Sequence, residues 1–487
     1  MSDNEEKMMP ASISQGDPRA RVLMGRQKPP KDGEGIRRSC FAFCMYDRGE
    51  YLVFHTLTRR LLALPPQYID YFIEGKVFPL SVLKQPAAAR LYEEHFLVPE
   101  HAPESRTYLE LKDILVLKEE LPRAVSHYVI LPTTACNARC FYCFEQGMRY
   151  RTMTLDTVSD TLRFIREHSP KDKKIHIHWF GGEPLCAPDN IDRITAGLEA
   201  AGIAFTAEMT SNGSLFTEET VKKAKEKWKI GKVQVTLDGM AGEYARRKRY
   251  ASGPEKPFET VMRNMHLLIA EGINVSVRLN VDEDNLGEIF RTADYLCGEF
   301  DGEERKRLSV YAHSLYGSTG EAPGACPAGA GSDALEERVL EINDYIQQRA
   351  LSVRDLGGLF DFKTHFCMAA APECNIVIDA EGGLFLCEAM PESFRIGDVK
   401  KGIDPDSFRL ATVPCEVRTE CRQCVFLPMC TEFDRCPNRM AWDSCFRQEK
   451  RNLERDLSFV HSLYLEQKSH AAPDGAAGQE VRTGVSD

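Results

Sequence analysis

The chain has 487 residues, of which 43% are hydrophobic and 28% charged, and its formal net charge is −11 at pH 7. This length allows about two to four domains with at least one large core, and the acidic balance argues against nucleic acid as the main partner. No apolar run approaches the roughly 18 residues of a membrane-spanning helix. The first twenty residues also lack the apolar core of an export signal. We therefore expect a cytoplasmic globular protein without a nucleic-acid or membrane partner.

The cysteine content is unusual, because seventeen cysteines are too many for an ordinary cytosolic core. Disulfides would need an oxidising compartment. Metal clusters in a reducing, anaerobic cytoplasm explain the number better.

The first 120 residues predict an arm followed by a small α+β module. Residues 1–37 are polar, rich in Pro, Gly, Lys and Asp, and show no periodicity, so a disordered arm is expected. Aromatic and β-branched residues at 40–46 and 51–54, separated by a glycine-containing turn, predict a β-hairpin. Helical patterns follow at 66–75, 79–96 and 107–118. The module is expected to span 38–120.

Strands and helices then alternate from 127 to about 315, which predicts a parallel sheet with right-handed crossovers in a domain spanning 121–330. Strands are predicted at 128–133, 174–180, 203–209, 232–237, 273–281 and 307–313. Helices are predicted at 155–168, 190–201, 217–227, 257–271 and 285–298. In barrels of this kind the functional side chains gather at the C-terminal ends of the strands.

A cysteine loop lies at the end of the first of these strands. Cys136, Cys140 and Cys143 are separated by three and then two residues. Three thiolates close in sequence can hold an iron–sulfur cluster and leave one coordination position open. A zinc loop, or three cysteines that are simply buried, is the alternative.

Other polar motifs end the next three strands. Gly181, Gly182 and Glu183 follow the second strand, where glycines permit close approach to the backbone and a carboxylate can accept from an ammonium. The third strand ends in 210–213 and the fourth in 235–239. We expect all three motifs to meet the cysteine loop at one edge of the sheet.

The C-terminal third contains a second cysteine-rich region. A Gly/Ala/Pro stretch at 317–331 breaks the alternating pattern, and a helix at 333–351 lies in a helical linker predicted at 331–358. Residues 359–450 form the predicted cysteine-rich domain, with a hairpin at 376–386. Eight of its cysteines divide into two sets of four: Cys367, Cys374, Cys387, Cys421, Cys424, Cys430, Cys436 and Cys445. Residues 451–487 are predicted to be a terminal helix and a disordered tail.

The loop of Cys136, Cys140 and Cys143 resembles that of the radical S-adenosylmethionine (SAM) enzymes. The resemblance implies an α/β fold, a partial (β/α)6 TIM-like barrel, with a 4Fe–4S cluster on these cysteines and SAM on the unliganded iron. It also implies SAM contacts from matching positions, with a threonine where a serine is common in the fourth strand: Tyr142, Gly181, Gly182, Glu183, Ser211, Asn212 and Thr236. A basic residue for the SAM carboxylate is expected in the run Arg246 to Arg249, with Lys248 as the candidate. Arg278 and Asn280 on the fifth strand are weaker candidates.

The C-terminal cysteines resemble a SPASM domain, which binds two auxiliary 4Fe–4S clusters. The resemblance implies one cluster on Cys367, Cys374, Cys387 and Cys436, and a second on Cys421, Cys424, Cys430 and Cys445. Five residues separate Cys430 from Cys436 where three are more usual, and Cys415 could replace one ligand. A zinc ribbon is the alternative.

The module at 38–120 resembles the winged-helix-like recognition domain of peptide-modifying enzymes, in which a leader peptide adds a strand to the sheet edge. A structural cap on the catalytic domain is an equally good interpretation. Cys40 and Cys44 could be ligands, although buried strand cysteines are commoner.

Together these resemblances imply a radical SAM oxidoreductase and peptide maturase of the thioether-forming, sactipeptide or ranthipeptide type. It would cleave SAM to a 5′-deoxyadenosyl radical and crosslink a precursor peptide that carries a leader, with electrons from flavodoxin or ferredoxin. Carbon–carbon crosslinking and sulfatase maturation to formylglycine are alternatives. In sulfatase maturases an aspartate beside a cluster cysteine acts as the base, and here Glu388 follows Cys387. A non-enzymatic electron carrier or redox sensor is the alternative from another class.

Overall fold

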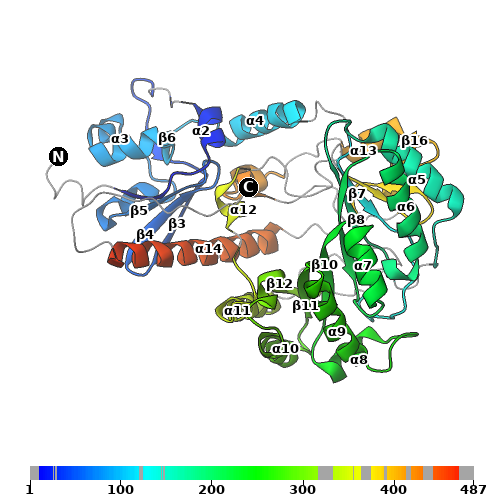
Figure 1. Ribbon diagram of the computed structural model, residues 1–487. Coiled ribbons are helices and arrows are strands. Elements are labelled where there is room, and N and C mark those ends of the chain that lie inside the picture. The colour runs from blue at the N-terminus through cyan, green and yellow to red at the C-terminus, as the bar shows by residue number, and fades with distance from the viewer. Residues whose placement is uncertain are drawn as a thin grey trace.

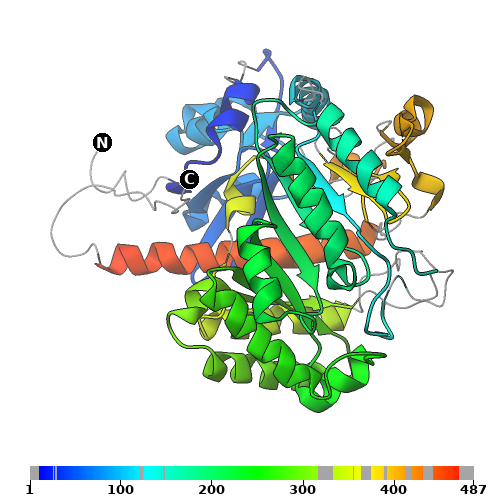
Figure 2. The ribbon, with the colours of Figure 1, turned by 45° about the vertical axis from the view of Figure 1, so that its right-hand side comes forward.

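The computed structural model describes residues 10–25, 27, 30–119, 124–143, 145, 149–315, 333–354, 356–362, 375–388, 392–412, 418–430 and 442–470. Figure 1 shows a small N-terminal α+β domain on one side and a large parallel sheet with its helices on the other. A long C-terminal helix runs beneath the N-terminal sheet toward the middle of the molecule (Figures 1 and 2). No helix of the described residues is long and apolar enough to cross a membrane.

The predicted N-terminal hairpin is confirmed as β3 (Ala42–Asp47) and β4 (Glu50–His55), which pair antiparallel. The sheet continues through β5 (Arg60–Leu64) to β1 (Ala11–Ser14), and β2 (Ile36–Arg38) pairs separately with β6 (Leu97–Pro99). The helical patterns become two 3-10 helices and two α-helices: η1 (Pro66–Phe72), η2 (Leu80–Lys84), α3 (Pro86–Glu93) and α4 (Glu104–Glu119). The predicted continuous helix at 79–96 is thus divided at Pro86, whose ring cannot continue a preceding helix.

The prediction of a disordered arm over 1–37 is wrong for its described part. β1 pairs with β5, Ala11 opposite Ala63, and α2 (Pro18–Met24) follows. Ile13 is 8% exposed and packs on the sheet, while Asp17 accepts a hydrogen bond from the backbone N–H of Phe362 at 2.7 Å. One buried apolar residue and the backbone hydrogen bonds of an edge strand therefore order this segment, although its polar composition predicted disorder.

The predicted parallel sheet is confirmed. Its strands lie in the order β12-β11-β10-β9-β8-β7, each parallel to its neighbour. They are β7 (His127–Ile130), β8 (Ile175–Trp179), β9 (Phe205–Ser211), β10 (Ile230–Leu237), β11 (Asn274–Val281) and β12 (Leu308–Ser314). The helices between them are α5 (Leu155–His168), η3 (Pro184–Cys186), α6 (Pro188–Ala200), α7 (Glu218–Glu226), α8 (Ala241–Lys248), α9 (Pro257–Ala270), α10 (Leu286–Glu299) and η4 (Glu304–Arg307). Every predicted strand and helix of this region is present, and α8, η3 and η4 are additions.

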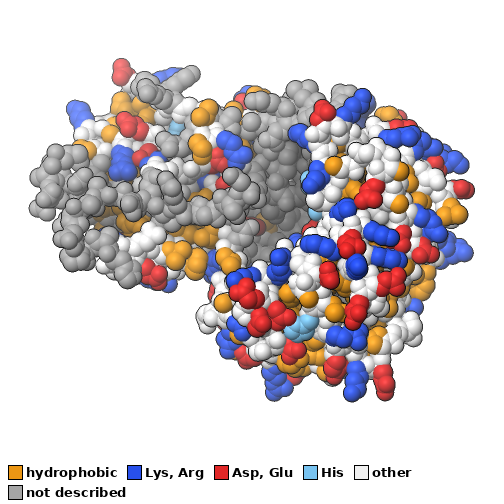
Figure 3. All heavy atoms as spheres, viewed as in Figure 1, with side chains coloured by type: hydrophobic (Ala, Val, Ile, Leu, Met, Phe, Trp, Pro, Cys, Tyr) orange, Lys and Arg blue, Asp and Glu red, His pale blue; other side chains and the backbone are white. Residues whose placement is uncertain are grey.

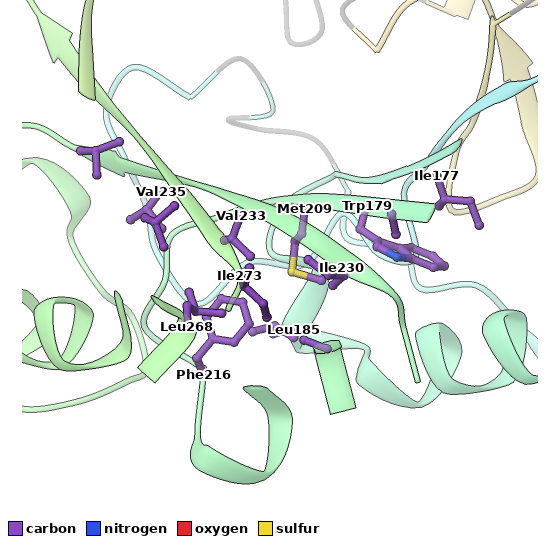
Figure 4. Packing of buried hydrophobic residues seen from close by; sticks show 14 of the residues in the cluster. Ile177, Trp179, Leu185, Met209, Phe216, Ile230, Val233, Val235, Leu268 and Ile273 are labelled. Atoms are coloured by element: carbon purple, nitrogen blue, oxygen red, sulfur yellow. The ribbon is translucent and has the colours of Figure 1, made fainter. Parts of the chain in front are cut away.

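The main core lies between this sheet and the outer helices. Alternate strand residues such as Ile177, Trp179 and Met209 point to the helices, where Leu185, Phe216 and Leu268 meet them (Figure 4). The outer helices carry intermixed Lys, Arg, Asp and Glu side chains on their solvent side (Figure 3). The opposite, inner face of the sheet carries polar residues, among them His178 with Thr210, and Thr236 with Arg278.

The predicted linker helix is confirmed as α11 (Asp333–Gln348), which packs into the main core beside β12. A short helix, α12 (Gly357–Phe360), follows. The predicted C-terminal hairpin is β13 (Asn375–Ile378) and β14 (Gly383–Phe385), but it does not stand apart from the barrel. β13 pairs in parallel with β7, so the hairpin extends the same sheet, together with β15 (Gly397–Asp398) and β16 (Gly402–Ile403).

The chain ends in α13 (Pro405–Thr412), two short turns, η7 (Cys421–Gln423) and η8 (Leu427–Met429), and α14 (Trp442–His470). α14 packs Leu453, Leu457 and Val460 against the N-terminal sheet. The α/β fold with an N-terminal α+β domain and a cysteine-rich C-terminal part is therefore as predicted.

Candidate active site

The three loop cysteines follow β7 at the C-terminal edge of the parallel sheet. The backbone N–H of Arg139 donates to the Lys248 carbonyl at 2.9 Å, and that of Cys143 donates to the Cys140 carbonyl at 3.2 Å, which closes the loop on itself and on α8. Burial, followed by the charges of neighbouring groups including the other thiols, raises the pKa of Cys136 to about 12 and that of Cys143 to about 11. Buried thiols this close to one another become thiolates only with a compensating cation, as a cluster supplies.

The loop provides the ligand type that an iron–sulfur cluster takes. Cys136, Cys140 and Cys143 are three free thiols on one loop. Three thiolates leave one iron of a 4Fe–4S cluster open to another ligand. The residues present therefore fit such a cluster.

Gly181 and Gly182 bring the end of β8 against the start of the cysteine loop. Gly181 has φ of 111°, a conformation that favours glycine. A Cβ on Gly182 would lie 2.5 Å from the Thr134 carbonyl oxygen and 2.6 Å from that of Ala135. The backbone that approaches these glycines belongs to the start of the cysteine loop. The glycines therefore allow the loop to pack closely against the end of β8, whereas the sequence suggested that they allow close approach by a ligand.

Glu183 is fully buried and links the second and third strand ends. Its carboxylate accepts from the Ser211 hydroxyl at 2.9 and 3.1 Å, from the Asn212 backbone N–H at 2.8 Å and from the Leu185 N–H at 3.2 Å. Burial raises the pKa of Glu183 to about 7, although these hydrogen bonds and Lys248 oppose the shift. Three donors leave one lone-pair direction of the carboxylate for a ligand.

Asn212 ties the third strand to the cysteine loop. Its side-chain N–H donates to Asn137 Oδ1 at 2.7 Å, and Asn137 donates in turn to the Ser214 hydroxyl at 2.9 Å. Asn212 Nδ2 also lies 4.0 Å from Cys136 Sγ. Asn212 thus contacts both Glu183 and the cysteine loop, and Ser211 contacts Glu183.

A second cluster of polar side chains surrounds Lys248, which is 2% exposed. Its ammonium donates to Tyr142 Oη at 2.8 Å and to Thr236 Oγ1 at 2.6 Å, and it pairs with Asp238 at 3.3 Å. Tyr142 donates to Asp238 at 2.7 Å, and Asn280 donates to the other Asp238 oxygen at 2.9 Å. Burial alone would lower the pKa of Lys248, but the charges of Asp238, Tyr142, Cys140 and Tyr244 together more than offset it, so the pKa is raised.

This geometry gives Lys248 a positioning role. Its ammonium donates two hydrogen bonds, to Tyr142 and Thr236, and its charge is paired with Asp238. Its contact with a SAM carboxylate stays a prediction.

The other basic residues of the run point elsewhere. Arg246 is exposed and pairs with Glu243 at 2.6 Å, while Arg247 is fully buried and pairs with Asp282 at 2.7 Å. Arg249 has φ of 48° and ends α8. Two of the four are therefore buried at strand ends: Lys248 beside Asp238 after β10, and Arg247 beside Asp282 after β11.

Sequence reasoning did not include three residues of the site. Asp238 belongs to the motif at 235–239, so its position was available in the sequence, but its pairing with Lys248 was not. Tyr244 and Tyr250 share a hydrogen bond of 2.8 Å between their hydroxyls, and Tyr250 lies 3.4 Å from Asn212 Oδ1. Both tyrosines come from α8 and the turn after it, which carried no recognisable motif.

Cys387 lies two residues after β14, which runs antiparallel to β13 and therefore to β7, and its Sγ lies 3.7 Å from Glu388 Oε2. Glu388 lies near His178 on β8, where burial lowers the histidine pKa and the carboxylates of Glu208 and Glu388 oppose the shift. Cys367, Cys374, Cys415 and Cys436 lie outside the described residues.

Cys421, Cys424 and Cys430 form a compact loop over η7 and η8, and Cys445 lies in the first turn of α14. The Phe426 and Phe446 rings, 5.2 Å apart, bring the loop and the helix together. The N-terminal domain holds this loop: the Thr56 hydroxyl donates to the Val425 carbonyl at 2.6 Å, and Arg59 donates to that of Pro428 at 3.0 Å.

A parallel α/β sheet whose C-terminal edge is built around three thiols, a buried carboxylate and a Lys–Asp pair is the architecture of a cofactor-dependent barrel. Residues 130–296 match the family model described as the Radical SAM superfamily. This part of the chain is a radical SAM domain.

The chain is similar to curated proteins over the same region. It is 26% identical over 188 residues to Fe-coproporphyrin III synthase of Methanosarcina barkeri, covering 39% of this chain and 44% of that protein. It is 29% identical over 170 residues to a probable GTP 3′,8-cyclase of Archaeoglobus fulgidus, covering 33% of this chain and 54% of that protein. The chain spans about half the length of the curated relatives that it matches.

Among solved structures, the fold resembles native anSMEcpe with bound AdoMet, with a TM-score of 0.54 and 14% identity over 69% of this chain and 100% of that one. The same protein with bound AdoMet and the Cp18Cys peptide gives a TM-score of 0.53, with 69% of this chain and 99% of that one covered. At this identity the likeness establishes the shared fold.

Proposed function

We propose that the protein is a radical SAM enzyme that reductively cleaves SAM and uses the 5′-deoxyadenosyl radical to oxidise a ribosomally made peptide. The observation that carries the proposal is the meeting of Cys136, Cys140 and Cys143 with Glu183 and the Lys248–Asp238 pair at one sheet edge. An electron carrier would need the cysteines alone, whereas this edge also provides acceptors and donors for a polar cosubstrate.

The loop cysteines would hold a 4Fe–4S cluster, which supplies the electron that cleaves SAM when bound. Glu183 would accept from the SAM ammonium through its remaining lone pair, and Ser211 and Asn212 would be oriented by it. Tyr142 and Thr236 would line the SAM site in the positions fixed by Lys248. Burial of these groups keeps water out of the site, and a carbon radical needs such a dry environment.

The substrate class is supported by two observations. The similar structure of anSMEcpe contains a peptide, and the N-terminal domain is an α+β sheet module of the kind to which an extended peptide can add a strand. A precursor peptide with a leader is therefore proposed as the substrate, with flavodoxin or ferredoxin as the electron donor in a reducing cytoplasm.

A thioether crosslink is the proposed product. Hydrogen transfer from a substrate carbon forms the new C–H bond of 5′-deoxyadenosine. Bonding of a cysteine sulfur to that carbon then releases one proton and one electron. Glu388, beside Cys387, is proposed as the proton acceptor, and an auxiliary cluster as the electron acceptor. Carbon–carbon crosslinking would use the same groups without a substrate thiol.

Two auxiliary clusters are proposed, one on Cys367, Cys374, Cys387 and Cys436 and one on Cys421, Cys424, Cys430 and Cys445. The second set is supported by the contact between the 421–430 loop and α14. Three clusters predict about twelve irons per chain, four for each 4Fe–4S unit.

The test is anaerobic reconstitution followed by reaction with SAM and dithionite. We expect 5′-deoxyadenosine from the unaltered protein and none from Cys140→Ala, which should lose about four irons and keep the rest. Cys297→Ala, on the outer helix α10, is the matched control and should retain both iron and activity. Failure of the fully loaded protein to form 5′-deoxyadenosine would exclude the enzyme and leave the electron carrier.

A further inference from the structure

The N-terminal sheet has two edges, and the chain's own first strand occupies one of them. β1 is the outermost strand and pairs antiparallel with β5, Ala11 opposite Ala63 and Ser12 opposite Leu62. The edge of a sheet is also the place where an extended peptide adds a strand. Any peptide that is to bind along β5 must therefore first replace β1.

β1 is a short and irregular strand. It has four residues, and its register against β5 shifts between Ser12 and Ser14. Such a shift leaves a residue outside the regular ladder of hydrogen bonds. Ile13 is the one buried residue of β1, whereas all five residues of β5 are buried. The contacts that hold β1 are therefore few for the surface that it covers.

β1 also matches only one of the two apolar faces beside it. Ile13 packs with Leu61 of β5 and with α14 in one core cluster. Leu62 and Leu64 point to the other face, toward the cluster that includes α3. Ser12 lies opposite Leu62 and therefore brings a hydroxyl to this second face. A strand with apolar side chains on both faces would bury more apolar surface against β5 than β1 does.

The chain is fixed directly after β1. The backbone N–H of Asp17 donates to the Thr58 carbonyl at 2.9 Å, and the Asp17 carboxylate accepts from the Phe362 N–H at 2.7 Å. Gly16 precedes this fixed point and has a φ of 72°, which favours glycine. Residues 11–14 can thus leave the sheet while α2 stays in place. The short tether gives β1 an effective concentration on the order of millimolar, so a replacing peptide must pair better than β1 does.

We propose that β1 is a displaceable strand that closes the β5 edge in the free enzyme and gives way to an extended segment of the precursor peptide. The segment that fits has apolar side chains on both faces, one against α14 and one beside Leu62. Weakly pairing peptides are excluded, because they cannot compete with the tethered strand. The inference rests on the proposed function for the nature of the peptide, and it assigns to residues 11–14 a role in selecting that peptide.

The test measures, by fluorescence anisotropy, the dissociation constant of a labelled peptide of residues 10–16 that carries Ser12→Val. The partner is the full-length reconstituted protein without SAM. Ile13→Asp in the protein removes the buried contact of β1, so this variant should bind the peptide roughly tenfold more tightly than the unaltered protein. Ser12→Val in the protein improves β1 itself and should weaken binding. Val22→Asp, at an exposed position of α2, is the matched control and should change nothing.

Hydrogen exchange measured by mass spectrometry locates the bound peptide. In Ile13→Asp the amides of β5 should exchange faster than in the unaltered protein and regain protection when the peptide is added. A second peptide that also carries Ile13→Asp should not bind. Equal dissociation constants for Ile13→Asp and the unaltered protein would overturn the proposal, and so would binding that leaves β5 unprotected.

Iron content and circular dichroism establish that each variant is folded, and Ile13→Gly replaces Ile13→Asp if that variant is not. SAM cleavage is independent of this binding. Absence of 5′-deoxyadenosine would therefore contradict the proposed function, while the peptide measurements still decide the role of β1.

Discussion

Glu183 shows how one residue of the site combines a structural and a binding role. It is fully buried, yet its carboxylate joins the end of β8 to Ser211 and Asn212 at the end of β9. Its folded pKa of about 7 lies above the ordinary 4.5, so the folded state binds more protons between these values. Ionisation of Glu183 therefore costs folding stability as the pH rises from about 4.5 to about 7.

The same pKa predicts a pH dependence of SAM binding. Only the ionised carboxylate can accept from the SAM ammonium, so affinity should rise through pH 7 and be about tenfold weaker at pH 6 than at pH 8. Glu183→Gln should bind SAM more weakly at pH 8 and lose the dependence. Equilibrium dialysis with the reconstituted protein measures both. An unchanged pH profile in Glu183→Gln would assign the dependence to another group.

Lys248 marks the limit of sequence reasoning at the scale of residues. The motifs identified which strand ends carry polar groups, and Cys136, Glu183, Ser211 and Asn212 do converge. Which of the four consecutive basic residues turn inward, here Arg247 and Lys248, depends on the rotation of α8, a helix that the pattern did not predict. Pairing of Lys248 with Asp238 is a tertiary contact between α8 and β10, and no local propensity encodes it.

At the scale of elements, Gly182 couples the end of β8 to the cysteine loop. The added methyl group of Gly182→Ala would meet backbone oxygen atoms of Thr134 and Ala135 at 2.5 and 2.6 Å, which cannot move as a side chain can. We expect the loop to shift and the protein to lose about four irons on reconstitution, that is, one cluster. Gly242→Ala is the control, since no atom lies within 4 Å of its Cβ position. Equal iron content in the two variants would contradict this account of Gly182.

The parallel sheet was predictable because its signal is local. Strands and amphipathic helices can be located from the local hydrophobic pattern alone. In α5, for example, Val158, Phe164 and Ile165 are buried on one side. β1 was not predictable, because Ala11–Ser14 owes its order to the edge of β5 and to the distant Phe362. Attachment of β13 to β7 likewise depends on pairing between segments about 250 residues apart, which no periodicity reveals.

At the scale of the whole molecule, α14 connects the proposed second auxiliary cluster to the N-terminal domain. Cys445 lies in its first turn, and farther along the fully buried His461 is 2.8 Å from Asp47 and 3.0 Å from Glu50 of the β3–β4 hairpin. Burial would raise the pKa of Asp47, but hydrogen bonds from His461, Ser458 and Arg48 more than offset it, so the pKa is lowered. Peptide docking on the N-terminal sheet and the cluster loop would then share one rigid helix.

Removal of the imidazole should loosen that helix. Both ring nitrogens lie within hydrogen-bond distance of carboxylate oxygens, and a hydrogen bond to a charged group contributes about 1.5–3 kcal/mol. In His461→Leu we expect amide hydrogens of α14 around this position to exchange about ten- to a hundredfold faster, measured by mass spectrometry. Lys468→Met is the control, because that exposed lysine lies 3.7 Å from Glu50 and should contribute little. Exchange that is equally slow in His461→Leu would mean that apolar packing of Leu453, Leu457 and Val460 alone fixes α14, and that the N-terminal domain and the cluster loop are joined without the charged contact.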